Sequence, residues 1–118
     1  MTKIYTLQPG QIKWIQGEAK DFHDLQKLVG GYIESVPLAA PVTLYCNEEG
    51  KVNALPPTAI WLYEGKPYDL LVGPLVLIGP PDEDGSDTDA TPEMLSTVED
   101  IVRPVGPDFP IPQWMKKR

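Results

Sequence analysis

Near the N-terminus, the spacing of hydrophobic residues changes from helical to strand spacing within one stretch, LQKLVGGYIESVPL (residues 25–38). Apolar side chains recur on one helical face from position 22 to position 29, and Asp21 stands where an N-cap belongs. Gly30-Gly31 supplies a residue that takes a positive φ without a Cβ clash, as a helix end requires. Period-two alternation follows from Tyr32 to Val36. We therefore predict a helix over 21–29, a glycine turn and a strand over 32–36.

Two antiparallel strand pairs are predicted from β-prone segments on either side of turn signals. Residues 4–7 and 11–16 flank a Pro-Gly turn, which predicts an N-terminal strand pair. Residues 42–47 are β-branched and aromatic, and Glu48-Glu49-Gly50 fits a three-residue hairpin loop with glycine at the left-handed position. The sequence therefore predicts a hairpin whose second strand runs over residues 51–55.

The second half of the chain contains the most apolar run and a second helix. Residues 59–63 fit either a helical turn or a strand. Residues 70–78 are apolar on both faces, as in a central buried strand, and Pro74 within them implies a bulge or a sheet edge. Thr91 caps a helix that has Pro92 at its first position and an apolar stripe reaching position 102.

These elements predict a single α+β domain over residues 1–103, with a mostly antiparallel sheet and two helices. The length of 118 residues agrees with one domain that buries a modest core. Prolines at positions 104, 107, 110 and 112 oppose regular structure, so residues 104–118 are expected to form a proline-rich C-terminal tail.

The charge and the cysteine count narrow the classes of partner and location. Seventeen acidic residues against ten basic ones give a net charge of −7, which disfavours nucleic acid as a partner because phosphate contacts need clustered lysine and arginine. The single cysteine, Cys46, excludes a disulfide within the chain, and the first residues contain no apolar signal-peptide core. The most apolar run is about half the length of a membrane-spanning helix. We expect a cytoplasmic protein that does not bind a membrane.

The acidic residues between Asp82 and Asp89 suggest a calcium loop, because calcium is bound by several carboxylate and carbonyl oxygens. With Gly85 at the sixth position of such a loop, the first and last positions fall on Pro80 and Thr91, where ligating acids belong. We therefore expect a solvated loop and no metal site.

Neither the histidine nor the cysteine has the partners that catalysis needs. His23 is the single histidine, so a zinc site would lack most of its preferred ligands, and the residue falls on the exposed face of the predicted helix. Cys46 has no histidine nearby in sequence to activate it and fits a packing role. We predict no catalytic residue at either position and no cofactor.

Polar and aromatic residues on neighbouring predicted strands are candidates for a ligand surface. A rigid sheet that presents mixed stacking and hydrogen-bonding groups on one side suits a small ligand. The alternative is that these residues form an ordinary solvent face. The ligand-binding candidates are Tyr32, Glu34, Tyr45, Asn47 and Asn53.

Three blocks of the sequence together resemble a known family. LQKLVGGYIESVPL, LYCNEEGKVNALPP and YDLLVGPLVLIG occur in this order, and the similarity extends over about residues 3–79. By these blocks, the chain resembles the family named domain of unknown function 3846. Its members are short proteins of bacteriophages, plasmids and bacterial genomes. The resemblance implies an origin in a phage or mobile element, and it assigns no reaction, cofactor or site residue.

Three hypotheses of function follow. The first is a small non-enzymatic accessory protein of a phage or mobile element that binds a host protein or a small metabolite, with action against host defence as one variant. The second is a small enzyme in which Glu34 or Glu48 works with Tyr32 or Tyr45 as acid and base. The third is an interaction module that docks through its tail, with Phe109, Ile111 and Trp114 as apolar anchors.

Overall fold

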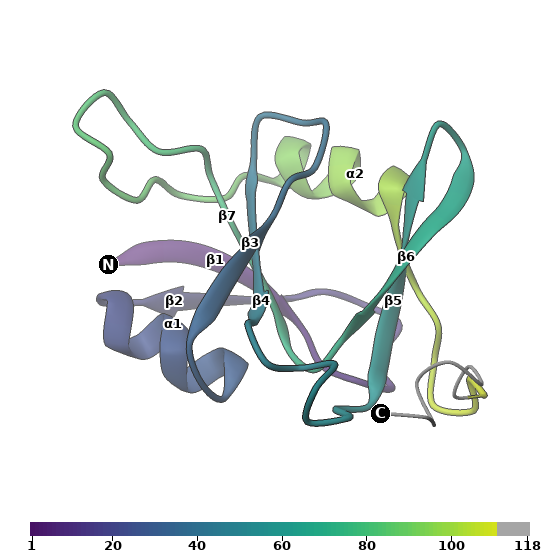
Figure 1. Ribbon diagram of the computed structural model, residues 1–118. Coiled ribbons are helices and arrows are strands. Elements are labelled where there is room, and N and C mark those ends of the chain that lie inside the picture. Colours follow the sequence, from purple (N-terminus) through teal and green to yellow (C-terminus); the bar gives the residue numbers. More distant parts are fainter. Residues whose placement is uncertain (111–118) are drawn as a thin grey trace.

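The computed structural model describes residues 1–110 and contains two antiparallel sheets and two helices (Figure 1). The larger sheet has the strand order β2-β1-β7-β4-β3, with β1 Thr2–Leu7, β2 Ile15–Ala19, β3 Ile33–Val36, β4 Thr43–Asn47 and β7 Leu75–Ile78. The smaller sheet has the order β6-β5-β8, with β5 Pro57–Tyr63, β6 Lys66–Val72 and β8 Val102–Pro104. The helices are α1 Phe22–Val29 and α2 Pro92–Ile101. The predicted α+β class with antiparallel strands and two helices is confirmed.

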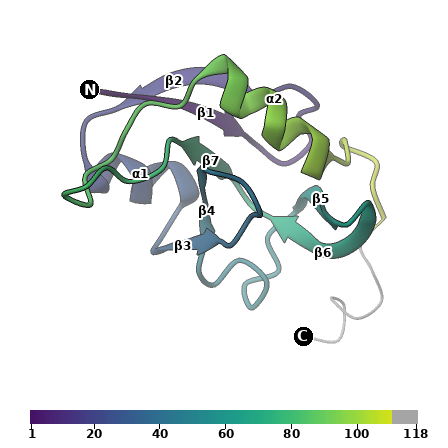
Figure 2. The same ribbon diagram turned by 90° about the horizontal axis from the view of Figure 1, so that it is seen from above.

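The larger sheet is buried on both faces, each by a different partner. On one face, Leu25 and Val29 of α1 pack against Ile4, Val76 and Ile78. On the other face, Leu75 and Leu77 meet a core that includes residues of β5, β6, α2 and β8. Figure 2 shows α2 running toward the smaller sheet and away from α1. The principal core therefore lies between the two sheets, with α2 along it.

We predicted that the apolar run over residues 70–78 forms one strand, but it contains parts of two strands. Residues up to Val72 belong to β6 of the smaller sheet, and residues from Leu75 belong to β7 at the centre of the larger one. The chain changes sheets at Gly73, which has a φ of 71° and donates its N–H to Pro56 O at 2.8 Å. Pro74 follows with no N–H to offer a ladder, so the two residues together end one strand and start the next.

The strand predicted over residues 51–55 is also wrong. This segment forms turns, in which Asn53 N–H donates to Glu49 O at 2.9 Å and Leu55 N–H donates to Gly50 O at 2.9 Å. The place beside β4 is instead taken by β7, whose four residues are all buried. Burial of β7 removes both of its apolar faces from water, and the free energy gained in this way exceeds that of a local hairpin over residues 51–55.

The remaining predictions agree with the structure in part or in full. The N-terminal strand pair exists, although its second strand starts at Ile15 rather than at position 11. Residues 59–63, which fitted either a helical turn or a strand, lie within β5. The helices carry the predicted caps: Asp21 accepts from Asp24 N at 3.1 Å, and Thr91 accepts from Met94 N at 3.2 Å.

The end of α1 has the geometry that its glycines predict. Gly30 has a φ of 81°, and the N–H groups of Gly30 and Gly31 both donate to Gln26 O, at 2.9 and 3.0 Å. This is the paired bonding of a helix end that satisfies its last carbonyls.

Near the C-terminus, the chain still packs on the domain after α2. Val105 N–H donates to Thr58 O at 3.1 Å, and Phe109 packs against Leu70 and Val72. The first apolar anchor predicted in the tail therefore contacts its own domain, while Ile111 and Trp114 lie outside the described residues.

Candidate functional site

A cleft of about 280 Å³ opens between the two sheets, at the end of the principal core. One wall comes from β3 and β4, with Glu34, Val36 and Cys46, and the other comes from the β5–β6 hairpin. The turns after β4 form the rim. Its volume is just below the range usual for small-molecule sites, and open edges extend it toward solvent.

The lining of the cleft is mixed in chemistry. Three carboxylates, those of Glu34, Glu48 and Asp69, lie around it with one ammonium group, that of Lys51. Apolar surface is supplied by Trp61 and by valine and leucine side chains of β3 and β6. Negative charge thus exceeds positive charge at this surface, as it does in the whole chain.

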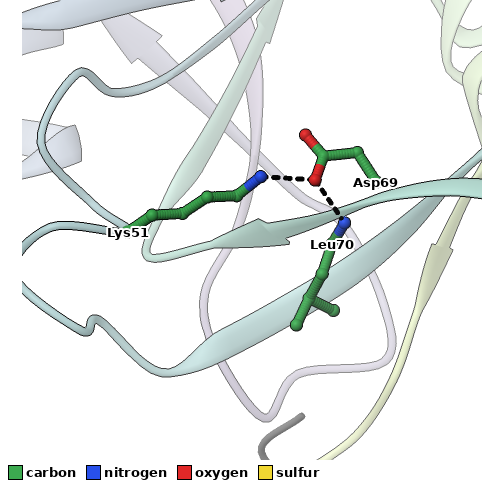
Figure 3. Close-up of polar contacts among 3 residues, drawn as sticks. All are labelled: Lys51, Asp69 and Leu70. Atoms are coloured by element: carbon green, nitrogen blue, oxygen red, sulfur yellow. Dashed lines mark hydrogen bonds and ion pairs between the residues drawn. The ribbon is translucent and has the colours of Figure 1, made fainter. Parts of the chain in front are cut away.

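Asp69 joins the rim of the cleft to its wall. Its Oδ1 accepts from Lys51 Nζ and, at 2.8 Å, from Leu70 N–H (Figure 3). Both charged side chains keep about a third of their surface exposed, at 30% and 33%. The pair anchors the irregular segment after β4 to the hairpin, so it helps to hold the two walls in place. Since it is partly solvated, we assign it a small net stabilisation, of about 1 kcal/mol or less.

An aromatic group stiffens the hairpin wall. Trp61 of β5 lies directly opposite Asp69 of β6, so both side chains occupy the face toward the cleft. The Trp61 and Tyr68 rings meet edge to face, with centroids 4.9 Å apart. Trp61 is 8% exposed, which leaves it as part of the wall rather than a free side chain.

Cys46 lines the cleft and is partly buried, and its thiol is protonated at neutral pH. Burial raises the pKa of the thiol to about 11, with Glu34 adding to the shift and Lys51 opposing it. A thiol in this state is a poor nucleophile. The electrostatics of the cleft therefore agree with the packing role predicted for Cys46.

The structure brings two of the five predicted ligand residues together and places the other three elsewhere. Glu34 and Asn47 line the cleft. Tyr45 packs on the opposite face of the sheet beside the α1 core, Tyr32 is 69% exposed before β3, and Asn53 is exposed in the turns. The expected common side of the sheet is therefore wrong for Glu34 and Tyr45.

The register explains that separation. Glu34 pairs with Cys46, and Ser35 pairs with Tyr45, so Glu34 and Tyr45 point to opposite faces. Neither Tyr32 nor Tyr45 lines the cleft that holds Glu34 and Glu48. An acid and base pair of the kind that the enzyme hypothesis requires is not assembled there.

Asn47 has a structural role in addition to its place in the lining. Its Nδ2 donates to Val29 O at 3.1 Å, and its Oδ1 accepts from Glu49 N–H at 2.8 Å. A Cβ at Gly31 would lie 3.0 Å from Asn47 Nδ2, so the glycine leaves room for this contact. The side chain ties the end of α1 to the turn after β4.

Three charged or aromatic residues of the cleft were missed by sequence reasoning: Lys51, Trp61 and Asp69. Lys51 was assigned to a strand that does not form. Trp61 and Asp69 face each other because of the β5–β6 register, which includes shifts along its length. The Glu64-Gly65 turn between these strands, at a φ of 52° and 77°, indicates the hairpin but not this pair, because without the shift between Trp61 and Leu62 its register would place Trp61 opposite Tyr68.

Other groups of chemical interest lie away from the cleft. His23 is exposed on α1, and among residues 1–110 no three histidine, cysteine or acidic side chains are grouped to hold a metal ion. The acidic loop is organised by its own contacts: Asp82 accepts from the N–H groups of Asp84 and Ser86, each at 2.9 Å. No helix in the described part of the chain is long and apolar enough to cross a membrane.

Comparison with known families identifies this chain's relatives. The profile of the family described as domain of unknown function (DUF3846) matches residues 1–103, which include all the residues of the cleft. No curated protein matches the chain, and no solved structure does. Because the matched region is most of the 118 residues, the chain belongs to the family domain of unknown function 3846.

Proposed function

We propose that this chain is a small non-enzymatic accessory protein of a phage or mobile element, which acts by binding a host protein or a small metabolite in the cleft between its sheets. The observation that carries the proposal is the lining of this cleft, where three carboxylates and a lysine surround an apolar wall. Such a combination of orienting charges and apolar surface is typical of binding sites.

The surrounding chemistry supports binding over turnover. The cleft thiol is held protonated, with its pKa raised to about 11, and the single histidine lies on α1 at the other face of the larger sheet. The tyrosines that the enzyme hypothesis pairs with Glu34 do not line the cleft. The origin in a phage or mobile element rests on the family resemblance.

Native mass spectrometry of the protein, purified gently from bacterial lysate, tests the proposal. We expect a retained mass, either a small molecule or a protein, that is lost in Glu34→Gln. The matched control is Glu99→Gln, which makes the same change at an exposed position of α2 and should keep the retained mass.

Two results would contradict the proposal. One is a retained mass that both variants keep equally, since the ligand would then not use the cleft. The other is substrate turnover by the purified protein that Glu34→Gln abolishes, since the cleft would then be a catalytic site.

A further inference from the structure

The outer edge of β3 has no strand beside it in the part of the chain that the structure describes, because β3 is the last strand of the larger sheet. Glu48 N–H donates to Tyr32 O at 2.9 Å, and these two residues continue the register in which Ile33 lies opposite Asn47. In an antiparallel pair, the residues that bond across to the partner alternate with residues whose N–H and C=O face away. Ile33 and Ser35 therefore direct their backbone groups outward, to the open edge.

Clefts flank this edge on both faces of the sheet. The cleft between the sheets includes Glu34 on one face. A second cleft, of about 370 Å³, includes Tyr45, Thr43 and Asp87 on the other. Residues 35–37 line both clefts. Successive side chains of a strand point to opposite faces, so a segment paired with β3 would send alternate side chains into the two clefts.

The charge of the two clefts selects among possible occupants. Glu34 and Glu48 line the first cleft beside the Lys51–Asp69 ion pair, and Asp87 lines the second. The pKa of Tyr45 is raised by burial and by Asp87, so its hydroxyl stays neutral and adds no charge. Lysine or arginine side chains suit such surroundings, since their aliphatic stems can lie on the apolar wall while their charged ends meet the carboxylates.

From the open edge, the two clefts and their charge, we infer that β3 binds an extended, basic segment of a partner protein as an additional strand. The inference rests on the proposed function and specifies its partner as a peptide segment. A second copy of this chain fits less well, because it would bring its own Glu34 and further negative charge to the same edge. A small metabolite would use the cleft but would leave the backbone groups of Ile33 and Ser35 unpaired.

The test uses the full-length, ¹⁵N-labelled protein and a blocked synthetic hexapeptide that alternates lysine and valine. We expect this peptide to shift the amide resonances of Ile33 and Ser35 and to slow their hydrogen exchange by about tenfold or more at saturation. A matched peptide with glutamate in place of lysine should not bind. A lysine peptide with alternate backbone amides methylated should bind about tenfold more weakly, because it lacks the donors that pair with β3.

Variants of the protein, in place of variants of the peptide, test the same contacts. Ser35→Pro removes an N–H that faces outward, and proline is tolerated at an edge strand, so the variant should fold and lose about tenfold in peptide affinity. Ser35→Val changes the side chain at the same position but keeps the N–H, so it should bind the peptide about tenfold more tightly than Ser35→Pro does. Glu34→Gln should weaken the lysine peptide and reduce the salt dependence of its binding, whereas Glu99→Gln should change neither.

Three results would overturn the inference. The first is binding of a small molecule in the mass spectrometry experiment with no binding of the lysine peptide, which would leave the proposed function standing. The second is peptide binding that leaves the amides of Ile33 and Ser35 unchanged. The third is protection of both amides before any peptide is added, because another part of the chain or a second copy would then occupy the edge.

Discussion

Replacement of Asn47 by alanine is expected to destabilise the protein through two lost hydrogen bonds. Asn47 Nδ2 donates to Val29 O at 3.1 Å, and Asn47 Oδ1 accepts from Glu49 N–H at 2.8 Å. The variant leaves the last carbonyl of α1 and the turn amide without these partners. With a net contribution of about 0.5–1.5 kcal/mol for each bond, Asn47→Ala should lower the free energy of unfolding by about 1–3 kcal/mol.

The matched control is Asn53→Ala, because Asn53 is exposed in the neighbouring turns. Its effect should stay within about 0.5 kcal/mol, as for most surface substitutions. Urea unfolding followed by circular dichroism measures both. With an m-value of about 2 kcal/mol/M, the midpoint for Asn47→Ala should fall by roughly 0.5–1.5 M. Equal midpoints for the two variants would refute the structural role of Asn47.

Three further predictions concern the core, the cleft thiol and the acidic loop. Leu77→Ala, at the fully buried centre of β7, should lower the free energy of unfolding by about 2–5 kcal/mol in urea titration, and a loss below 1 kcal/mol by the same measurement would contradict this packing. Cys46 should react slowly with iodoacetamide at pH 7.5 and faster as pH rises toward its pKa of about 11. Glu34→Gln should lower that pKa, because the Glu34 carboxylate helps to raise it. A reaction rate that does not change with pH would contradict a protonated thiol. Gly79→Ala should lower the thermal midpoint by several degrees, because the added Cβ would lie 2.3 Å from Thr88 Oγ1; an unchanged midpoint would show that the loop adjusts freely.

The elements that could be predicted from sequence are those specified by neighbouring residues. The boundaries of α1 follow from Asp21 and Gly30, whose side-chain cap and positive φ act within one turn of the helix. The start of α2 follows in the same way from Thr91 and Pro92. These signals need no knowledge of the rest of the chain.

The misplaced elements depend on contacts between distant parts of the chain. The hairpin loop after β4 has suitable residues, but β7 arrives from more than 25 residues later to pair with β4. The apolar run that contains β7 looks continuous in the sequence. It is divided at Gly73 because its first half pairs in the smaller sheet and its second half pairs in the larger one. Local patterns contain no information on that pairing.

The predicted grouping of the candidate residues on one side of the sheet failed for a similar reason, although Glu34 and Asn47 both line the cleft. Alternation within β3 and within β4 was predicted, but the relative register of the two strands was not, because residues 37–42 between them have no fixed turn type. A shift of one residue moves every side chain of a strand to the opposite face. Glu34 therefore shares a face with Cys46 and not with Tyr45.

The central position of β7 also has a consequence for the protein as it is synthesised. Tyr5 of β1 pairs with Leu77, and so does Leu44 of β4, so neither strand can gain this neighbour until β7 has left the ribosome. Until then, the nascent chain holds two hydrophobic strands with open edges, a state that favours association with other chains. Rapid translation of residues 45–78, or a chaperone at the exit tunnel, shortens or covers this exposure. Either should therefore raise the yield of folded protein more than rapid translation of the residues near the C-terminus would.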